Sequence, residues 1–352
     1  MITPARFSLR AWPRGLLLVL VFLLPASGCA NPPAHVAPYT AGDPPYLERE
    51  EVQRFISEMV EEGFSRDELI ALFRSAKPQQ RVIDLMTRPA EARPWYSYRP
   101  IFVNARRIEE GERFWQENES LLLRAQETFR VNAEIIVAII GVETNYGRNQ
   151  GSFPVFDTLV TLGFDYPPRQ TFFRSELGHF LRLVREEPHL DLREVKGSYA
   201  GAMGRGQFIS SSYRAYAVDF SGDGQRDLIG SWPDAIGSVA NYFKQHGWVM
   251  GDAVVVPARV EGEAYKALLG GGFLPRHSLE DLARHGVRPA ANVAPDQLFS
   301  LIELQTEDGV EVWLGLNNFY VITRYNRSPL YAMAVHQVSQ GLIQARHSSI
   351  TR

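Results

Sequence analysis

One carboxylate is a candidate for acid–base chemistry because of the residues that precede it. Glu143 follows an apolar run over residues 135–142, and the turn-forming residues Asn145 and Gly147 come directly after it. The run is too long for a typical strand and too short to cross a bilayer, so it predicts a buried helix that ends at a surface or cleft. A carboxylate packed against aliphatic side chains loses hydration, which raises its pKa and lets it donate a proton near neutral pH. The same pattern also fits a glutamate at the solvated end of a core helix.

Two further segments could bind a polar ligand. Residues 196–213 contain four glycines, which allow a backbone to approach a ligand or another surface, and Ser198, Tyr199 and Gln207 could bond to hydroxyl or acetamido groups. The alternative is a structural glycine turn, and the missing Gly-Lys-Ser/Thr pattern disfavours a phosphate loop. Residues 93–100 predict a proline-bounded loop whose aromatic residues, Tyr98 among them, either stack on sugar rings or cover a core.

Residues 219–227 match the first part of a calcium-binding loop. Oxygen-bearing side chains occupy positions 1, 3 and 5, and glycine occupies position 6; the three side chains are Asp219, Ser221 and Asp223. The glutamate expected at position 12 is absent, so Asp234 is the nearby carboxylate able to complete the shell. Ser231 to Asp234 also resembles a helix capping box, and both roles can coexist. We expect Ca²⁺ here, and the lack of a His/Cys cluster disfavours zinc or a redox metal.

The N-terminus has the composition of an export signal. Three arginines precede a short apolar run over residues 15–24, which is about half the length needed to span a membrane. Cys29, the only cysteine, follows small residues in an arrangement that resembles a bacterial lipoprotein box, so residues 1–28 are a predicted signal peptide. Cys29 is then the predicted lipidation site, and the proline-rich residues 29–45 a tether. A single cysteine excludes an intramolecular disulfide.

The rest of the chain predicts a soluble protein that is mainly helical. Apolar periodicity and capping residues predict helices, and a hairpin is expected around residues 307–309. The predicted helices cover residues 52–60, 65–73, 112–129, 170–185, 234–245 and 331–345, and the predicted strands cover 254–257, 298–306 and 310–313. The net charge of −3 and the absence of a basic stripe with interleaved aromatics exclude a nucleic-acid partner.

Five motifs, in one order along the chain, resemble the membrane-bound lytic murein transglycosylase B family over about residues 46–345. They are Gly-Val-Glu-Thr-x-Tyr-Gly from Gly141, Lys-Gly-Ser-Tyr-Ala-Gly-Ala-Met-Gly from Lys196, Asp-Phe-Ser-Gly-Asp-Gly from Asp219, Asp-Ala-Ile-Gly-Ser from Asp234, and Asn-Phe-Tyr-x-Ile-Thr-Arg-Tyr-Asn from Asn318.

The resemblance implies an α+β fold in which helices dominate and a lysozyme-like core carries the active site. The expected parts are a helical lobe (46–130), the core with its EF-hand-like loop (131–252), a small mixed lobe (253–316) and a returning C-terminal segment (317–352). Glu143 matches the family's acid and base. Positions that line the glycan cleft match Tyr98, Ser198, Gln207, Tyr242, Tyr325, Asn326 and Tyr331. The calcium loop matches Asp219, Ser221, Asp223, Gln225 through its backbone, and Asp234.

The implied reaction cleaves the β-1,4 bond between N-acetylmuramic acid and N-acetylglucosamine in peptidoglycan and forms a 1,6-anhydro product. It needs one carboxylate and no organic cofactor, whereas most glycosidases use two carboxylates. The implied setting is the periplasmic face of the outer membrane, where a lipid-anchored monomer acts on glycan strands beside other cell-wall synthesis or hydrolysis proteins. Two alternatives stay open: a lysozyme-type hydrolase with Asp157 or Asp165 as second carboxylate, and a catalytically silent, calcium-dependent peptidoglycan-binding lipoprotein.

Overall fold

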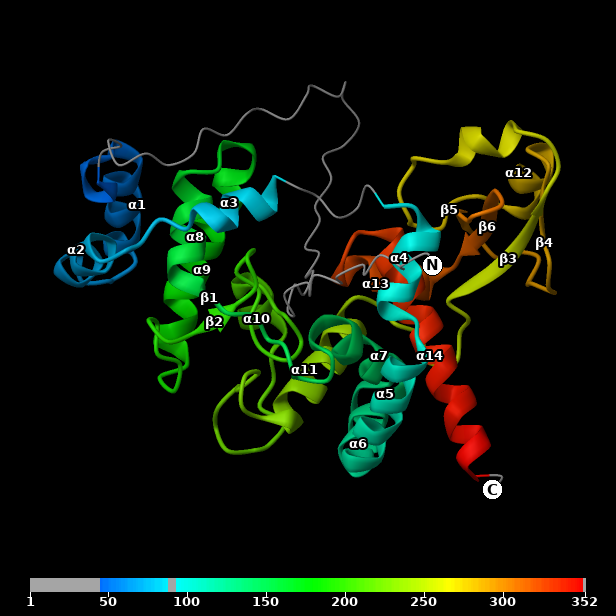
Figure 1. The fold of residues 1–352 in the computed structure, drawn as a ribbon, viewed down its shortest axis with the longest axis horizontal. Coiled ribbons are helices and arrows are strands. Elements are labelled where there is room, and N and C mark those ends of the chain that lie inside the picture. The colour runs from blue at the N-terminus through cyan, green and yellow to red at the C-terminus, as the bar shows by residue number, and fades with distance from the viewer. Residues whose placement is uncertain (1–44, 88–92, 351–352) are drawn as a thin grey trace, which may run out of the picture.

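The computed structural model describes residues 45–87 and 93–350, which form many helices and two small antiparallel sheets (Figure 1). The predicted helix-dominated α+β class is therefore confirmed. The predicted signal peptide, nearly all of the tether, and Cys29 lie outside the described residues. Within the described ranges, no helix has the length and apolar character needed to cross a membrane.

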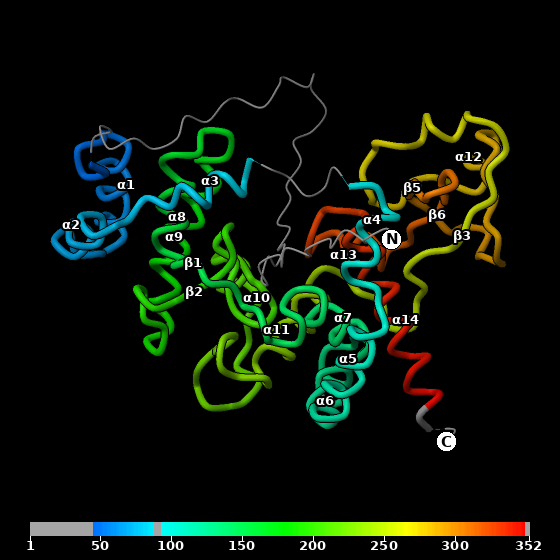
Figure 2. Tube along the Cα trace, viewed as in Figure 1, coloured from blue at the N-terminus to red at the C-terminus, as the bar shows by residue number. Residues whose placement is uncertain are grey.

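The first helices of the chain pack against a pair of helices from its middle, and Figure 2 shows this group at one end of the molecule. The first helix buries Val52, Phe55, Ile56 and Met59. Ser65 caps the second helix, because its side chain accepts from Glu68 N. Phe55 and Phe73 meet the ring of Phe164 at centroid distances of 6.0 and 5.9 Å. The group comprises η1 (Tyr46–Glu48), α1 (Glu50–Glu61), α2 (Arg66–Arg74), α3 (Gln80–Met86), α8 (Val155–Phe164), η3 (Pro167–Arg169) and α9 (Gln170–Glu186).

Two predictions for residues 93–129 are wrong. The aromatic segment predicted as a loop is helix α4 (Trp95–Phe102), because Trp95, Tyr98 and Phe102 share one buried helical face that outweighs the cost of Pro100 inside the helix. The helix predicted over 112–129 is two helices, α5 (Ala105–Glu117) and α6 (Glu119–Phe129), which meet at Asn118. The Asn118 amide donates to Phe114 O at 2.9 Å, and such bonds compete with helix continuation.

The centre of the molecule is built on α7 (Ala133–Thr144), with the long final helix α14 (Pro329–Ile350) packed along it. Every residue of α7 from Ile135 to Thr144 is buried, as the apolar run predicted. Helices α5 and α6 also pack on α7. Residues 46–130, expected as one helical lobe, therefore contribute helices both to the group around α8 and α9 and to the centre around α7. The remaining central helices are α10 (Ser210–Tyr216), α11 (Trp232–Gln245) and α13 (Asn317–Tyr325).

The small lobe carries a four-stranded antiparallel sheet in the order β4-β3-β6-β5. The predicted hairpin is confirmed, because β5 and β6 pair from Ser300–Gly315 to Gln305–Val310. A separate apolar cluster centred on Phe299 and Leu314 fills this lobe. Its elements are β3 (Val255–Val260), η4 (Ala264–Leu268), α12 (Leu279–Arg284), β4 (Val287–Pro289), β5 (Ser300–Gln305) and β6 (Val310–Gly315).

A two-residue strand, β2 (Lys196–Gly197), pairs with β1 (Phe153–Pro154), although the sequence predicted no strand beside the glycine-rich segment. Glycine explains the close approach. A Cβ atom at Gly151, whose φ is +95°, would lie 2.0 Å from Gly197 O. The glycines in this region therefore let two stretches of backbone meet.

Candidate active site

Glu143 lies in the last turn of α7, and its side chain is only 6% exposed. The helix ends at Asn145, which adopts a left-handed conformation with φ 52°, as the turn-forming residues predicted. Burial raises the pKa of Glu143 from 4.5 to about 8, and a hydrogen bond from Tyr331 lowers it in part. The carboxyl group is therefore mostly protonated at neutral pH, which is the state that a proton donor requires.

Tyr331 supplies the direct contact to this carboxyl group. Its hydroxyl donates to Glu143 Oε1 at 2.5 Å from the first turn of α14. Burial and the nearby Glu143 charge also raise the pKa of Tyr331 and of Tyr325, so both phenols stay protonated. Tyr98, 1% exposed, is a further electrostatic neighbour of Tyr331. These residues come from α4, α7, α13 and α14, so four separate elements build the surroundings of one carboxylate.

Tyr325 connects this cluster to the glycine-rich segment, because its hydroxyl donates to Gly206 O. Its ring meets Tyr242 edge to face at a centroid distance of 4.8 Å, and the Tyr242 hydroxyl donates to Arg324 O at 2.6 Å. Phe208 contacts both rings at 5.8 Å. The predicted residues Tyr242, Tyr325 and Tyr331 are thus near neighbours of Glu143 or of one another.

The polar side chains of the glycine-rich segment brace the segment itself. Ser198 Oγ accepts from Ala200 N and Ala202 N at 3.3 and 3.1 Å. Gln207 Nε2 donates to Gln150 O and Gly204 O. Within the described residues, Gln207 Oε1 is a buried acceptor without a hydrogen-bond partner.

Two other predicted site residues, Tyr199 and Asn326, have structural contacts of their own. Tyr199 is partly buried against the main core, and Asn326 Oδ1 accepts from Ser328 N at 3.1 Å between α13 and α14. Ligand contacts of Ser198, Tyr199, Gln207 and Asn326 stay predictions.

Three residues that the sequence did not single out hold the end of α7 in place. Thr144 Oγ donates to Arg205 O at 3.0 Å and accepts from Gly147 N, which ties α7 to the glycine-rich segment. The Arg107 guanidinium donates to Gly141 O, and the Tyr146 hydroxyl donates to Arg107 O at 2.8 Å. Thr144 was detectable as the polar neighbour of Glu143. Arg107 lies in an ordinary amphipathic helix and carries no sequence signal.

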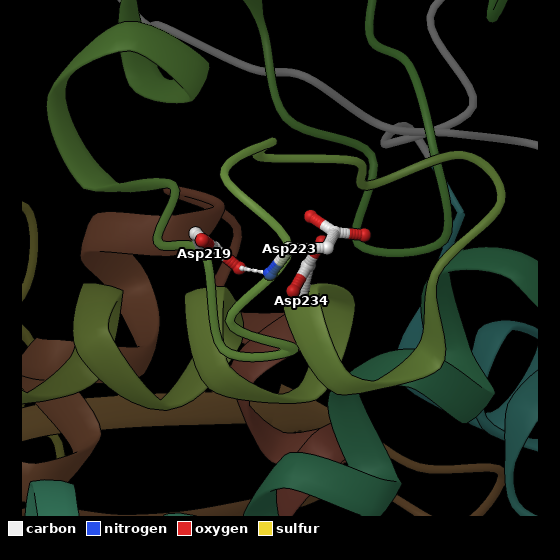
Figure 3. Close-up of side chains that lie close together, drawn as sticks. All are labelled: Asp219, Asp223 and Asp234. Carbon is white, nitrogen blue, oxygen red and sulfur yellow. Dashed lines mark hydrogen bonds between the residues drawn. The ribbon is translucent and has the colours of Figure 1, made fainter.

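The predicted metal loop gathers three carboxylates (Figure 3). Oxygen atoms of Asp219, Asp223 and Asp234 lie within 4.8 Å of one another, a separation that one cation with oxygen ligands at about 2.4 Å can bridge. Asp219 accepts from Ser221 Oγ and from the backbone of residues 222–224, and these bonds lower its pKa, that from Gly224 N most. A carboxylate set of this kind suits a hard cation.

Asp234 lies at the start of α11 and borders the predicted metal loop, and its role as a metal ligand stays a prediction. Its N–H donates to Ser231 Oγ at 3.3 Å, which caps α11. Its fully buried carboxylate accepts from the backbone N–H groups of Phe220, Ser221 and Asp227 and so faces the loop. Gln225, expected to contribute through its backbone, donates its N–H to Asp223 Oδ1 at 2.9 Å.

The chain is similar to known proteins over most of its length. The model of the transglycosylase SLT domain matches residues 47–340. Membrane-bound lytic murein transglycosylase B of Escherichia coli K12 is 42% identical over 335 residues, which cover 92% of this chain and 90% of the relative.

Two solved structures share the fold. Catenated lytic transglycosylase SltB1 of Pseudomonas aeruginosa superposes with a TM-score of 0.80 at 49% identity and covers 85% of this chain and 98% of its own. The E. coli lytic transglycosylase Slt35 in complex with calcium superposes with a TM-score of 0.76 at 43% identity. The match covers 90% of this chain and 99% of the Slt35 chain. The resemblance inferred from five motifs is confirmed, and the chain belongs to the transglycosylase SLT domain family.

Proposed function

We propose that this protein is a lytic transglycosylase that cleaves the β-1,4 bond between N-acetylmuramic acid and N-acetylglucosamine in peptidoglycan. The observation that carries the proposal is the buried carboxyl group of Glu143, whose pKa is raised to about 8 and which accepts a hydrogen bond from a tyrosine. Protonated Glu143 donates to the glycosidic oxygen while the bond breaks. Its carboxylate then accepts the proton of the 6-hydroxyl of the same muramyl residue, which attacks C1 and closes the 1,6-anhydro ring.

Both candidates for a second carboxylate already bond to the N-terminal part of the chain, which supports a one-carboxylate mechanism. Asp157, one candidate for a second carboxylate, accepts from Lys77 N at 3.1 Å. Asp165, the other, accepts from the Tyr46 hydroxyl at 2.6 Å and forms an ion pair with Arg49. Both carboxylates therefore tie the N-terminal helices to α8. We assign them a structural role, which leaves the muramyl acetamido group to support the cationic centre.

Digestion of purified sacculi tests the proposal. The wild-type protein should release muropeptides that end in 1,6-anhydro-N-acetylmuramic acid, each lighter by one water than its hydrolysed counterpart. Glu143→Gln should bind sacculi and release none. Reducing-end muramic acid in the wild-type products would instead identify a hydrolase, and binding without any release would identify a silent binding protein.

We further propose that Asp219, Asp223 and Asp234, with Ser221 and the backbone of Gln225, hold a structural Ca²⁺ ion. The clustered carboxylates support this assignment, as does the calcium complex of the E. coli relative. We also propose that Cys29 is acylated and holds the protein at the periplasmic face of the outer membrane as a monomer. The membrane-bound relative supports a membrane location. Incorporation of labelled palmitate that Cys29→Ser abolishes would test the anchor.

A further inference from the structure

A cavity lies where the small lobe meets the central helices. Its volume is about 440 Å³, which is within the range of small-ligand sites, and its walls come from the start of α7, the middle of α14 and the chain leading into β3. In Figure 1 the first residues of β3 lie beside α14. Glu143 lies in the last turn of α7 and Tyr331 in the first turn of α14. The cavity instead uses Asn132 and Ile135 at the start of α7, and further along α14 it uses His336, Ser339 and Gln340. The cavity is therefore separate from the candidate active site.

Two indole rings line this cavity. Trp248 Nε1 donates to Asn132 Oδ1 at 3.1 Å, and its ring packs edge to face on Phe243. Trp313, on β6, is partly buried, and its Nε1 donates to Glu311 Oε2 at 3.2 Å. These contacts fix both indoles before any ligand binds. Trp248 is only 8% exposed, so the partly buried Trp313 offers the larger apolar face, which suits the C–H face of a pyranose ring.

The polar lining carries both acceptors and donors. Glu134 and Asp252 provide carboxylate oxygens, while Gln340 and Asn132 provide amide groups. The residues that line the cavity include no lysine or arginine. Such a lining opposes phosphates and other anions, and it matches the hydroxyl groups of a neutral sugar.

His336 adds a polar side chain to the wall of the cavity. Within the described part of the chain, its Nδ1 is buried without a hydrogen-bond partner, although buried polar atoms are normally paired. Burial lowers the pKa of His336 to about 4, so the ring is neutral at physiological pH. A neutral imidazole has one donor and one acceptor nitrogen and adds no charge to the cavity wall.

We propose that this cavity is a second, non-cleaving glycan site that binds an N-acetylglucosamine unit. The choice of this sugar rests on the proposed function, since a peptidoglycan strand supplies two sugar types. N-acetylmuramic acid carries a lactyl group that ends in a carboxylate or a peptide, and Glu134 and Asp252 oppose a carboxylate. N-acetylglucosamine is uncharged. A second site would hold the glycan strand while Glu143 cleaves elsewhere along it.

Binding of tri-N-acetylchitotriose to the Glu143→Gln protein tests the proposal by calorimetry. We expect two sites per chain. Adding Trp313→Ala should leave the affinity of one site unchanged and lower the affinity of the other by about tenfold or more, because the stacking surface is lost. Asp252→Asn should weaken the same site, whereas Leu298→Ala, an exposed residue of the same lobe, should preserve both. One site per chain, or two sites unaffected by Trp313→Ala, would overturn the inference.

Kinetics separate this inference from the proposed function. In protein with Glu143 intact, Trp313→Ala should raise KM for sacculi and leave kcat for a short soluble glycan fragment unchanged. If the wild-type protein releases anhydro products while only one sugar site is found, the second site fails and the proposed function stands. If no anhydro products form but two sugar sites are found, the proposed function fails instead. A lower kcat on the short fragment would indicate general damage and would also count against a separate site.

Discussion

The Tyr331 hydroxyl donates a 2.5 Å hydrogen bond to Glu143 Oε1 across 188 residues of chain. Glu143 lies in the last turn of α7 and Tyr331 in the first turn of α14, so the bond joins the end of one helix to the start of the other. Burial raises the pKa of this group and the tyrosine lowers it, with a balance at about 8. The acid is thereby kept protonated yet close to the pH at which it can also serve as a base.

Activity should decline as the pH rises through about 8, because the first step requires protonated Glu143. Above that pKa the protonated fraction falls by about tenfold for each pH unit. Initial rates of anhydro-muropeptide release, measured against pH at constant ionic strength, would trace this decline, which is the alkaline limb of the pH profile. A rate that stayed flat two units above the pKa would rule out Glu143 as the proton donor.

Glu143→Gln should make the protein more stable at neutral pH. The folded-state pKa of about 8 lies above the ordinary value of 4.5, so the folded protein holds a proton that the unfolded chain releases. Its stability therefore falls as pH rises between these two values, and glutamine removes this dependence. The gain should be near zero below pH 4.5 and reach about 3 kcal/mol at pH 7.

Urea unfolding of both proteins across that pH window measures the gain. Glu117→Gln, at an exposed position of α5, is the control and should change stability little at any pH. A Glu143→Gln gain that did not grow with pH would contradict the burial argument.

Tyr331→Phe should shift the alkaline limb of the pH profile upward. The hydroxyl hydrogen bond lowers the pKa of Glu143, so its removal lets burial act alone and raises that pKa further. We also expect kcat to fall by about tenfold, because the carboxyl group loses the bond that orients it. A purely structural role would reduce kcat at every pH and leave the limb in place.

Calcium should stabilise the protein through two aspartates that respond differently to substitution. Asp223 is exposed, so Asp223→Asn should weaken the calcium-dependent rise in Tm and leave the calcium-free protein unchanged. Asp234 is fully buried and accepts three backbone hydrogen bonds, so Asp234→Asn should also destabilise the calcium-free protein, by about 1 to 3 kcal/mol.

Thermal melts with and without a chelator distinguish the two effects. Equal melting temperatures of the wild-type protein under both conditions would show that the loop holds no stabilising ion.

The sequence predicted those features that depend on local patterns. The apolar run before Glu143 predicted a buried helix, and the spacing of Asp219, Ser221 and Asp223 predicted the cluster that the structure forms. The loop predicted over residues 93–100 was wrong, because the two prolines of this segment suggested a loop although its apolar residues lie on one helical face. The Glu143–Tyr331 bond has no local signal, since the partners are far apart in sequence, and only the family resemblance placed Tyr331 near the site. Arg107 and the cavity beside His336 depend on tertiary packing, which periodicity cannot reveal.

Gly141→Ala should disturb the end of α7 through Tyr146. A Cβ atom at Gly141 would lie 2.6 to 2.8 Å from the hydroxyl and ring atoms of Tyr146, and a Cβ atom at Gly111 on α5 would also meet this side chain. The ring cannot move freely, because its hydroxyl donates to Arg107 O. We expect a loss of about 1 to 3 kcal/mol in unfolding free energy and a lower kcat, since Glu143 lies two residues further along the helix.

Gly178→Ala in α9 is the matched control for this substitution. Its added Cβ atom would first meet Arg182 Nη1 at 3.1 Å, the end of a flexible side chain that can move aside. Because alanine favours helix over glycine, this variant should be neutral or gain up to about 1 kcal/mol. Urea unfolding and kcat on sacculi, measured for both variants, decide the matter. If Gly141→Ala matched the control in both unfolding free energy and kcat, the packing of Tyr146 against α5 and α7 would have no part in positioning Glu143.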